Sequence, residues 1–292
     1  MNSKPSERLR LAVPNKGRIA QPILELIEKS GLHIKNGGDR KLIAPTGDPE
    51  IEVLFARPID IPEYVANGAA DIGITGRDMV RERESDVAEL LDLELGTATL
   101  VLAVPDDAGI ADAADLDGAR IATEFPNLTR SFFKTKGIRV TIVPVGGACE
   151  ATPYLGIADA IVDLASSGNT LRTNRLRVIE EILESSTILI ANRGRMAMRG
   201  AKIEELRLAL ESVIRARGQV YVMMNVQKNA LEDVKRVLPG LSGPTVMEVA
   251  SADNLVAVHA VVAEDHIYQL ISQLKNAGAR DILVMPIERI IR

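Results

Sequence analysis

The chain has 292 residues, of which 46% are hydrophobic and 3% aromatic, and its formal net charge is -5. This length and apolar content allow sizeable cores in roughly two or three domains. The acidic balance and the few aromatic side chains exclude the basic stripe and stacking platforms of a nucleic-acid binder. The single cysteine, Cys149, excludes an internal disulfide and a cysteine zinc cluster, so we interpret it as a small structural residue.

The sequence contains no segment typical of membrane insertion or export. No apolar stretch approaches the ~20 residues that a membrane span needs, and the polar residues 1–8 are not followed by a signal-peptide core. We therefore expect a cytoplasmic protein that has no membrane partner.

In the first two thirds of the chain, short apolar runs alternate with amphipathic segments. Helical spacing of apolar residues over 19–27 follows the first run, and this alternation predicts an α/β fold. The predicted strands are residues 9–13, 51–55, 71–75, 100–104, 120–123, 140–143, 158–162 and 187–191.

Two crossings between lobes are expected in this part. Residues 95–105 could carry the chain from one lobe to the other, and the strand near residue 187 could return it. We predict a catalytic lobe I of residues 1–99 and 188–217 and a lobe II of residues 100–187, with a ligand cleft between them.

The last third has a different pattern. Predicted strands at 220–226, 246–250, 256–262 and 282–287 enclose helical faces at 231–238 and 267–274. The order β-α-β-β-α-β predicts a ferredoxin-like (ACT-like) module over residues 218–292. An amphipathic segment containing Ile203, Leu206, Leu210 and Val213 leads to it, and we place the boundary near Gly218.

A polar loop of small residues follows the predicted strand at 158–162. It reads DLASSGNTL over residues 163–171 and leads to a segment that could open a helix. Exposed backbone N–H groups, hydroxyl donors and a helix N-terminus together suit a phosphate, whereas the carboxylate of Asp163 suits sugar hydroxyls or a divalent metal. The loop therefore suggests a ribose-phosphate site, and the alternative is a surface turn rich in Ser and Gly.

Basic residues recur at the predicted ends of elements. Lys16 and Arg18 flank Gly17 after the first strand, where the alternative is a solvated basic turn. Further turns carry Arg40 with Lys41, Arg57 and Arg77. Four such turns in an acidic chain suggest that a polyanion binds here.

The remaining reactive side chains give weaker signals. Glu150 could be an acid in the first turn of a helix or a ligand contact. The three histidines lack metal-ligand spacing, and we interpret His259 as a half-buried, hydrogen-bonded ring in an apolar strand. No Ser or Cys lies in a nucleophile elbow.

Several segments together resemble the ATP phosphoribosyltransferase family. They read LRLAVPNKGRI, RKLIAPT, ARPIDIPEYVANGAADIGITGRDMV, RIATEFPNLTRSFF and GIADAIVDLASSGNTL, in this order. The last third is similar to the regulatory domain of the family's long form. The resemblance covers nearly the whole chain and implies two lobes of the periplasmic-binding-protein type.

The resemblance also implies an activity. The family condenses ATP with 5-phosphoribosyl 1-pyrophosphate, joining N1 of adenine to the ribose and releasing pyrophosphate. This is the first step of histidine biosynthesis. We accordingly expect Mg2+ as a cofactor with unknown protein ligands, histidine as a feedback inhibitor, and a homo-oligomer based on dimers and hexamers.

The site residues implied by the resemblance fall into four groups. Asp163 would hold the ribose hydroxyls, and the 5-phosphate would be cradled by Ser166, Ser167, Gly168, Asn169 and Thr170. The pyrophosphate would face the basic residues Lys16, Arg40 and Arg57, and the nucleotide side would be lined by Gly76, Arg77, Asp78 and Glu150. Histidine would bind at the loop of Gly243, Pro244 and Thr245.

The chain departs from the family pattern in two places. Phe125 stands where many relatives carry Tyr, which removes any hydrogen bond from that hydroxyl, and Ser166-Ser167-Gly168 differs from the commoner Ser-Thr-Gly. The alternative function is a non-catalytic, two-lobed solute-binding or sensor protein, which would explain the missing nucleophile.

Overall fold

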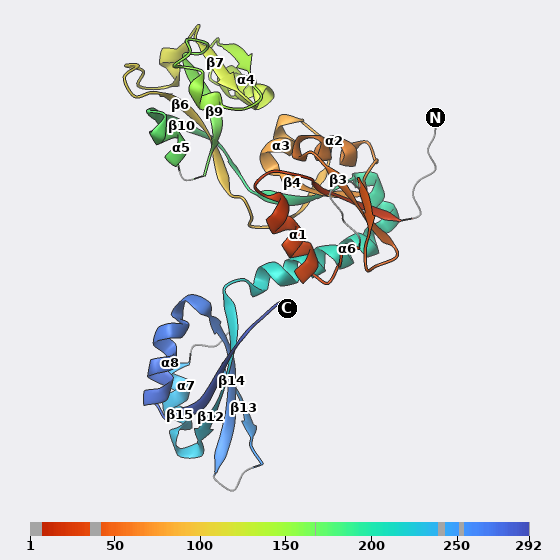
Figure 1. Cartoon of the computed structure of the whole chain (residues 1–292), viewed down its shortest axis with the longest axis vertical. Coiled ribbons are helices and arrows are strands. Elements are labelled where there is room, and N and C mark those ends of the chain that lie inside the picture. Colours follow the sequence, from red (N-terminus) through yellow and green to blue (C-terminus); the bar gives the residue numbers. More distant parts are fainter. Residues whose placement is uncertain (1–7, 36–41, 167, 239–242, 251–253, 292) are drawn as a thin grey trace. The chain divides into compact units, whose positions relative to one another are not determined.

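The computed structural model describes residues 8–35, 42–166, 168–238, 243–250 and 254–291. Its contacts divide the chain into two compact units, Met1–Leu208 and Ala209–Arg292. The first unit contains two mixed sheets and the second contains one antiparallel sheet, so the α/β class is confirmed (Figure 1). In the part of the chain that the structure describes, none of the helices could cross a membrane.

The first sheet, with its helices, forms what we call lobe I. Its six strands have the order β2-β3-β1-β4-β11-β5. Strands β1, β3 and β4 are parallel and nearly continuously apolar, as expected of strands covered on both faces. The elements are β1 (Leu9–Pro14), α1 (Ala20–Lys29), β2 (Ile43–Pro45), β3 (Ile51–Ala56), the 3-10 helix η1 (Pro58–Asp60), α2 (Ile61–Ala66), β4 (Ile72–Gly76), α3 (Arg77–Glu82), β5 (Ala88–Asp92) and β11 (Thr187–Ala191).

The second sheet, with its helices, forms lobe II. Its order is β10-β6-β9-β7-β8, with β7 parallel to β8 and β9. The elements are β6 (Ala98–Pro105), η2 (Ala113–Leu116), β7 (Arg120–Thr123), α4 (Pro126–Thr135), β8 (Thr141–Pro144), η3 (Cys149–Ala151), β9 (Ala160–Ala165), α5 (Asn169–Thr173) and β10 (Leu176–Ser185).

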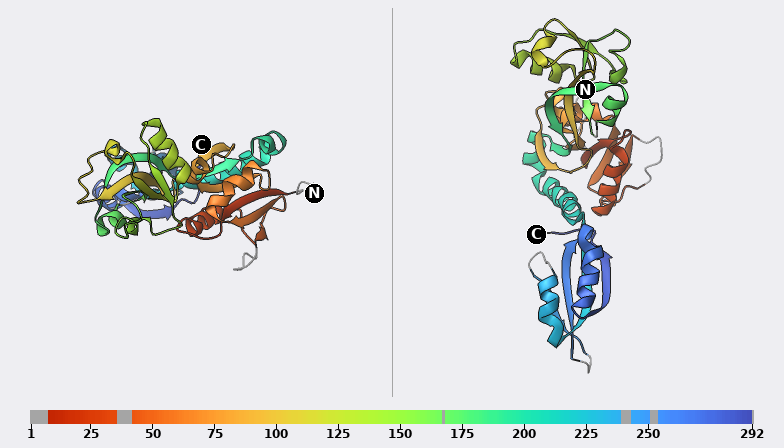
Figure 2. Two further views of the ribbon diagram at one scale, coloured as in Figure 1. Left: turned by 90° about the horizontal axis from the view of Figure 1, so that it is seen from above. Right: turned by 90° about the vertical axis from the view of Figure 1, so that its left-hand side faces the viewer.

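The chain passes between these lobes twice. It leaves lobe I between β5 and β6 and returns between β10 and β11, as Figures 1 and 2 show. Backbone bonds tie the two crossings together, because Leu93 N–H donates to Thr187 O at 2.9 Å and Thr187 N–H donates to Leu95 O at 2.8 Å. The pair of crossings forms the junction of the lobes.

The second unit has the predicted β-α-β-β-α-β order. Helices α7 and α8 pack on the face of the sheet that buries alternate residues such as Val222, Met224 and Val258. The sheet order is β13-β14-β12-β15, and the ferredoxin-like prediction is confirmed. The elements are β12 (Gln219–Gln227), η4 (Lys228–Ala230), α7 (Leu231–Val237), β13 (Thr245–Glu248), β14 (Leu255–Ala263), η5 (Glu264–His266), α8 (Ile267–Asn276) and β15 (Ala279–Pro286).

The predicted amphipathic connector forms α6 (Arg193–Ala216), which is kinked at Arg199, and Ile203, Leu206 and Leu210 are buried after the kink. The division between the two compact units falls within this helix. The helix ends before Gly218, whose φ of +65° suits a glycine after a helix. The proposed domain boundary near Gly218 stays a prediction.

Three strands were not predicted: β2, β5 and β10. The segment 170–176 was expected to open a helix, and α5 does begin at Asn169, but it ends at Thr173 and β10 begins at Leu176. Strand β10 carries Glu180, Glu181 and Glu184 among its apolar residues, a pattern with no strict alternation. It forms because β6 supplies antiparallel hydrogen bonds from residues far away in the sequence.

Candidate functional site

The β9–α5 loop carries most of the predicted phosphate contacts. Asp163 lies inside β9 and not at its end, because the strand continues through Ala165, which pairs with Thr99 of β6. Gly168 precedes α5 with a φ of +67°, a conformation that favours glycine, and a Cβ added there would meet no neighbour within 4 Å. Asn169 and Thr170 form the first turn of α5, whereas Ser167 lies outside the described residues.

Asp163 lies in an acidic environment. Strands β7 and β9 are adjacent and parallel, so Glu124, which follows β7, comes close to Asp163, and Glu150 approaches from η3. Burial, helped by the charges of Glu124 and Glu150, raises the pKa of Asp163 to about 6, although the Leu164 N–H donates to its Oδ1 at 2.7 Å. Asp163 and Glu150, predicted for different substrates, therefore lie in one cluster.

Glu124 was missed by the sequence analysis. It stands in the quoted segment RIATEFPNLT, but nothing in that segment indicates that it faces Asp163. An added Cβ at Gly147 would lie 3.8 Å from Glu124 Oε1, so the loop after β8 closes over the same carboxylate.

The β1–α1 loop reaches from lobe I to the predicted phosphate loop of lobe II. Arg18 Nη1 donates to Ser166 Oγ at 3.1 Å, which joins the two predicted anion sites. Lys16 is exposed in the same loop, beside Gly17 with a φ of +95°. Arg18 was noted in the sequence only as a basic residue, because a contact across 148 positions leaves no local signal.

The structure says less about the other basic residues that were predicted to contact the substrates. Arg57 is exposed in the turn between β3 and η1, with extended backbone. Arg40 and Lys41 lie outside the described residues.

The predicted nucleotide residues at the β4–α3 turn take part in an internal network. Asp78 is buried and accepts a hydrogen bond of 2.6 Å from the hydroxyl of Ser185. Burial raises the pKa of Asp78, while the bond from Ser185 opposes this change. A Cβ at Gly76 would lie 2.2 Å from Asp78 Oδ1, so glycine is required for this arrangement.

The side chain of Arg77, in the same β4–α3 turn, is also hydrogen-bonded within the protein. Its guanidinium binds Glu89, Asp92 and Ser186 at 3.1 to 3.2 Å, and Ser185 and Ser186 form the crossing from lobe II back to lobe I. The turn therefore holds the junction of the lobes, and its contact with a nucleotide stays a prediction.

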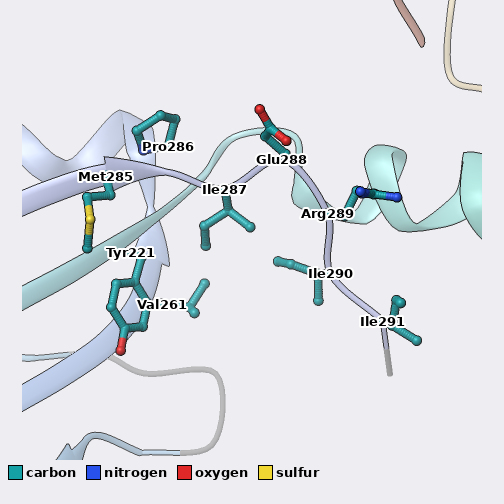
Figure 3. Close-up of a pocket in the computed structure, with 9 residues that line it drawn as sticks. All are labelled: Tyr221, Val261, Met285, Pro286, Ile287, Glu288, Arg289, Ile290 and Ile291. Atoms are coloured by element: carbon teal, nitrogen blue, oxygen red, sulfur yellow. The ribbon is translucent and has the colours of Figure 1, made fainter. Parts of the chain in front are cut away.

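The predicted effector loop belongs to the second unit. Gly243 has a φ of +88°, and Thr245 begins β13 opposite His259 of β14. The Nδ1 of His259 is hydrogen-bonded to the Tyr221 hydroxyl, which confirms the expected half-buried, hydrogen-bonded ring. Beside this pair, a surface hollow opens between Tyr221 and the segment after β15 (Figure 3).

The acidic side chains that the structure describes are candidate ligands for a metal ion. Among the described residues, no group of three or more His, Cys, Asp and Glu side chains is arranged to hold a metal ion.

Comparisons with known proteins cover nearly the whole chain. The family model for "ATP phosphoribosyltransferase" matches residues 57–212, and the model for "HisG, C-terminal domain" matches residues 216–289. The ATP phosphoribosyltransferases of Methanococcoides burtonii and Methanocella arvoryzae are 56% and 54% identical to it, each over 97% of this chain and over 99% and 100% of the relative.

A solved structure agrees with these matches. The ATP phosphoribosyl transferase (HisG:HisZ) complex from Thermotoga maritima contains a chain 30% identical to this one, with a TM-score of 0.64. The similarity covers 71% of this chain and 98% of the other. The chain belongs to the ATP phosphoribosyltransferase family, in the form that carries a C-terminal HisG domain.

Proposed function

We propose that the phosphoribosyl group of 5-phosphoribosyl 1-pyrophosphate is transferred to N1 of ATP where the β1–α1 loop meets the β9–α5 loop. The transfer of this group to ATP, with release of pyrophosphate, is the activity of the family and the first step of histidine biosynthesis. The observation that carries the location is the bond from Arg18 to Ser166, because it joins a basic loop to a loop suited to phosphate. Because both substrates are phosphorylated metabolites, we place the reaction in the cytoplasm.

Each group of residues has a separate role in this proposal. Asp163 accepts hydrogen bonds from the ribose hydroxyls, and the 5-phosphate is cradled by Ser166, Ser167, Gly168, Asn169 and Thr170. The pyrophosphate faces Lys16, Arg40 and Arg57, whose positive charges stabilise the negative charge that grows as it leaves. Gly76, Arg77, Asp78 and Glu150 are assigned to the nucleotide side.

The reaction needs orientation and electrostatic stabilisation more than proton transfer. N1 of adenine carries a lone pair and attacks C1 of the ribose directly, so no general base and no covalent enzyme intermediate is required. Positive charge develops on the ribose in an oxocarbenium-like transition state, and the carboxylates of Glu124, Glu150 and Asp163 suit that charge. Lys16, Arg40 and Arg57 would lie beside a pyrophosphate that carries Mg2+, and the ion would supply further charge neutralisation there.

A direct assay tests the function. The purified protein is mixed with ATP, 5-phosphoribosyl 1-pyrophosphate and Mg2+, and the N1-substituted adenine chromophore is followed by absorbance. Formation of the chromophore is expected, with a large loss in an Asp163→Ala variant that stays folded. No chromophore at any Mg2+ concentration would favour the non-catalytic binding protein.

We also propose that histidine binds the second unit and inhibits the first. Support comes from the match of residues 216–289 to the HisG C-terminal domain and from the separation of this unit by its own contacts. Gly243, Pro244 and Thr245 are the assigned contacts. Thr245→Arg should remove inhibition but keep activity, and calorimetry that detects no histidine binding to the intact protein would reject the role.

A homo-oligomer based on dimers and hexamers is part of this proposal. The sheet face opposite α7 and α8 carries exposed apolar side chains, including Met247, Leu283 and Met285. Such a face suits contact with another copy of the chain. Sedimentation velocity with and without histidine measures the populations of the oligomers.

A further inference from the structure

Helices α3 and α4 form a reciprocal contact between the two lobes. Helix α3 belongs to lobe I and ends at Glu82, and α4 belongs to lobe II and begins at Pro126. The Glu82 carboxylate accepts hydrogen bonds from Asn127 N–H at 3.0 and 3.2 Å and from Leu128 N–H at 3.0 Å. In return, Asn127 Nδ2 donates to Glu82 O, in the last turn of α3, at 2.9 Å. Each helix therefore satisfies the free backbone end of the other.

Local sequence explains why α4 needs this carboxylate. The position before the helix is Phe125, which offers no side-chain acceptor, and Pro126 in the first turn has no N–H. The next free donors are the N–H groups of Asn127 and Leu128, and Glu82 accepts both. A carboxylate is also favoured at a helix N-terminus by the helix dipole.

The contact is buried. Glu82 is only 5% exposed. A buried carboxylate is costly unless hydrogen bonds satisfy it, so any separation of the lobes that breaks these bonds leaves both the carboxylate and the N–H groups without partners. The contact thus resists changes in the distance between the lobes.

The same helix also contacts the junction of the lobes. At its first turn, the Asp78 N–H donates to Ser185 Oγ at 3.0 Å, and Met79 packs against the core of lobe II. Helix α3 is thereby held at one end by the crossing and at the other by α4. Residues just before α4 include Glu124, which lies beside Asp163. The start of α4 therefore also sets the position of one wall of the proposed ribose site.

We propose that Glu82 is a positioning residue that fixes the separation of lobe I and lobe II through the N-terminus of α4. In the proposed function, Lys16 and Arg57 come from lobe I and the phosphate loop from lobe II, and the inference rests on that assignment. Alignment of adenine N1 with ribose C1 then depends on the distance between the lobes. Glu82 touches neither reactant and acts through α4.

The test measures the distance between the lobes and the turnover of the same variants. Spin labels at Glu25→Cys in α1 and Asp107→Cys after β6 report the distance by double electron–electron resonance, and both positions are exposed. The native Cys149 is 1% exposed and burial raises the pKa of its thiol, so it is protected from labelling. Glu82→Ala removes the contact, and Glu82→Gln keeps the size but loses the charge. Glu84→Gln makes the same chemical change at an exposed position two residues further on.

Glu82→Ala is expected to broaden the distance distribution in the absence of substrates and to lower kcat on the order of 100-fold, because small misplacements of reactants have effects of this size. The dissociation constant of each substrate alone should change much less. Glu82→Gln should fall between Glu82→Ala and the wild type, and Glu84→Gln should match the wild type. The Gln variant keeps the test valid if the Ala variant does not fold.

An unchanged distance distribution in both Glu82 variants would overturn the inference, even if their melting temperatures fall. So would a broadened distribution with a wild-type kcat. If the wild-type protein gives no turnover, the proposed function fails, whereas the distance measurement still decides whether Glu82 holds the lobes.

Discussion

Two turns in this protein have the same local pattern and different surroundings. The β9–α5 turn and the β4–α3 turn each connect a buried strand to a short helix through a glycine, and each was predicted to bind a phosphorylated ligand. At Gly168 the space around an added Cβ is empty, whereas at Gly76 the Asp78 carboxylate fills it. The first turn is open to a ligand, and the second is satisfied by the protein itself.

The difference arises from residues far away in the sequence. Ser185 and Ser186, more than 100 positions after Asp78, occupy the hydrogen-bonding groups of the β4–α3 turn. In the β9–α5 turn, the long-range partner is Arg18, whose positive charge suits an anion. A strand–turn–helix pattern thus indicates where donors lie, and distant residues determine whether the donors remain available.

The largest expected effect is at the open turn. Gly168→Asp adds a negative charge where the 5-phosphate is proposed to bind, and we expect calorimetry to detect no binding of 5-phosphoribosyl 1-pyrophosphate. Gly137→Asp is the matched control, because Gly137 has a φ of +71° and equally open surroundings in the same lobe. Unchanged affinity in a folded Gly168→Asp protein would remove this turn from the site.

Arg18→Ala should have the next largest effect. Loss of a charged donor facing the phosphate loop should weaken 5-phosphoribosyl 1-pyrophosphate binding about 10- to 100-fold, which corresponds to about 1.5–3 kcal/mol. Its melting temperature should stay close to that of the wild type, because the arginine is exposed. A loss of melting temperature without a loss of affinity would instead make Arg18 a structural link between the lobes.

Asp78→Ala tests the closed turn. It leaves the hydroxyl of buried Ser185 without its acceptor, and we expect a loss of about 1–3 kcal/mol in the free energy of unfolding. Chemical denaturation measures this loss, and calorimetry with ATP should show a smaller change. If ATP affinity falls and stability does not, Asp78 contacts the nucleotide, as the family resemblance implied.

The sequence predicted those strands and loops whose structure depends on the residues nearby in the chain. Largely apolar runs such as residues 9–13 and 100–104 predicted buried strands correctly, and the strand-like segments 220–226 and 256–262 predicted strands of the sheet in the second unit. The phosphate loop was proposed because small and hydroxylated residues next to a helix suit a phosphate, and its binding of a phosphate stays a prediction.

Long-range contacts could not be predicted in this way. Glu82 has an ordinary helical environment in the sequence, and its partner Asn127 lies 45 residues away. Glu124 likewise comes next to Asp163 only because β7 and β9 are neighbours in the sheet. The resemblance to a family supplied the activity, but neither it nor the local pattern indicated that the β4–α3 turn is closed.

The last expected effect concerns the free energy of unfolding, which the partly buried carboxylate of Asp163 is expected to lower. The pKa of Asp163 is raised from 3.8 to about 6 by burial and by the neighbouring carboxylates. The ionised side chain therefore destabilises the folded state, fully above pH 6 and not at all below pH 3.8, so its effect grows as the pH rises through this window.

Asp163→Asn removes the charge but keeps the oxygen that accepts the Leu164 N–H. At pH 8 the variant should be more stable than the wild type by roughly 3 kcal/mol, and the difference should vanish near pH 4. Chemical denaturation across this range measures it, with the exposed Glu184→Gln of the same lobe as the control. Because the variant should also bind 5-phosphoribosyl 1-pyrophosphate poorly, stability and binding change in opposite directions. Equal stability of the two proteins at pH 8 would show that the ionised carboxylate of Asp163 does not destabilise the folded state.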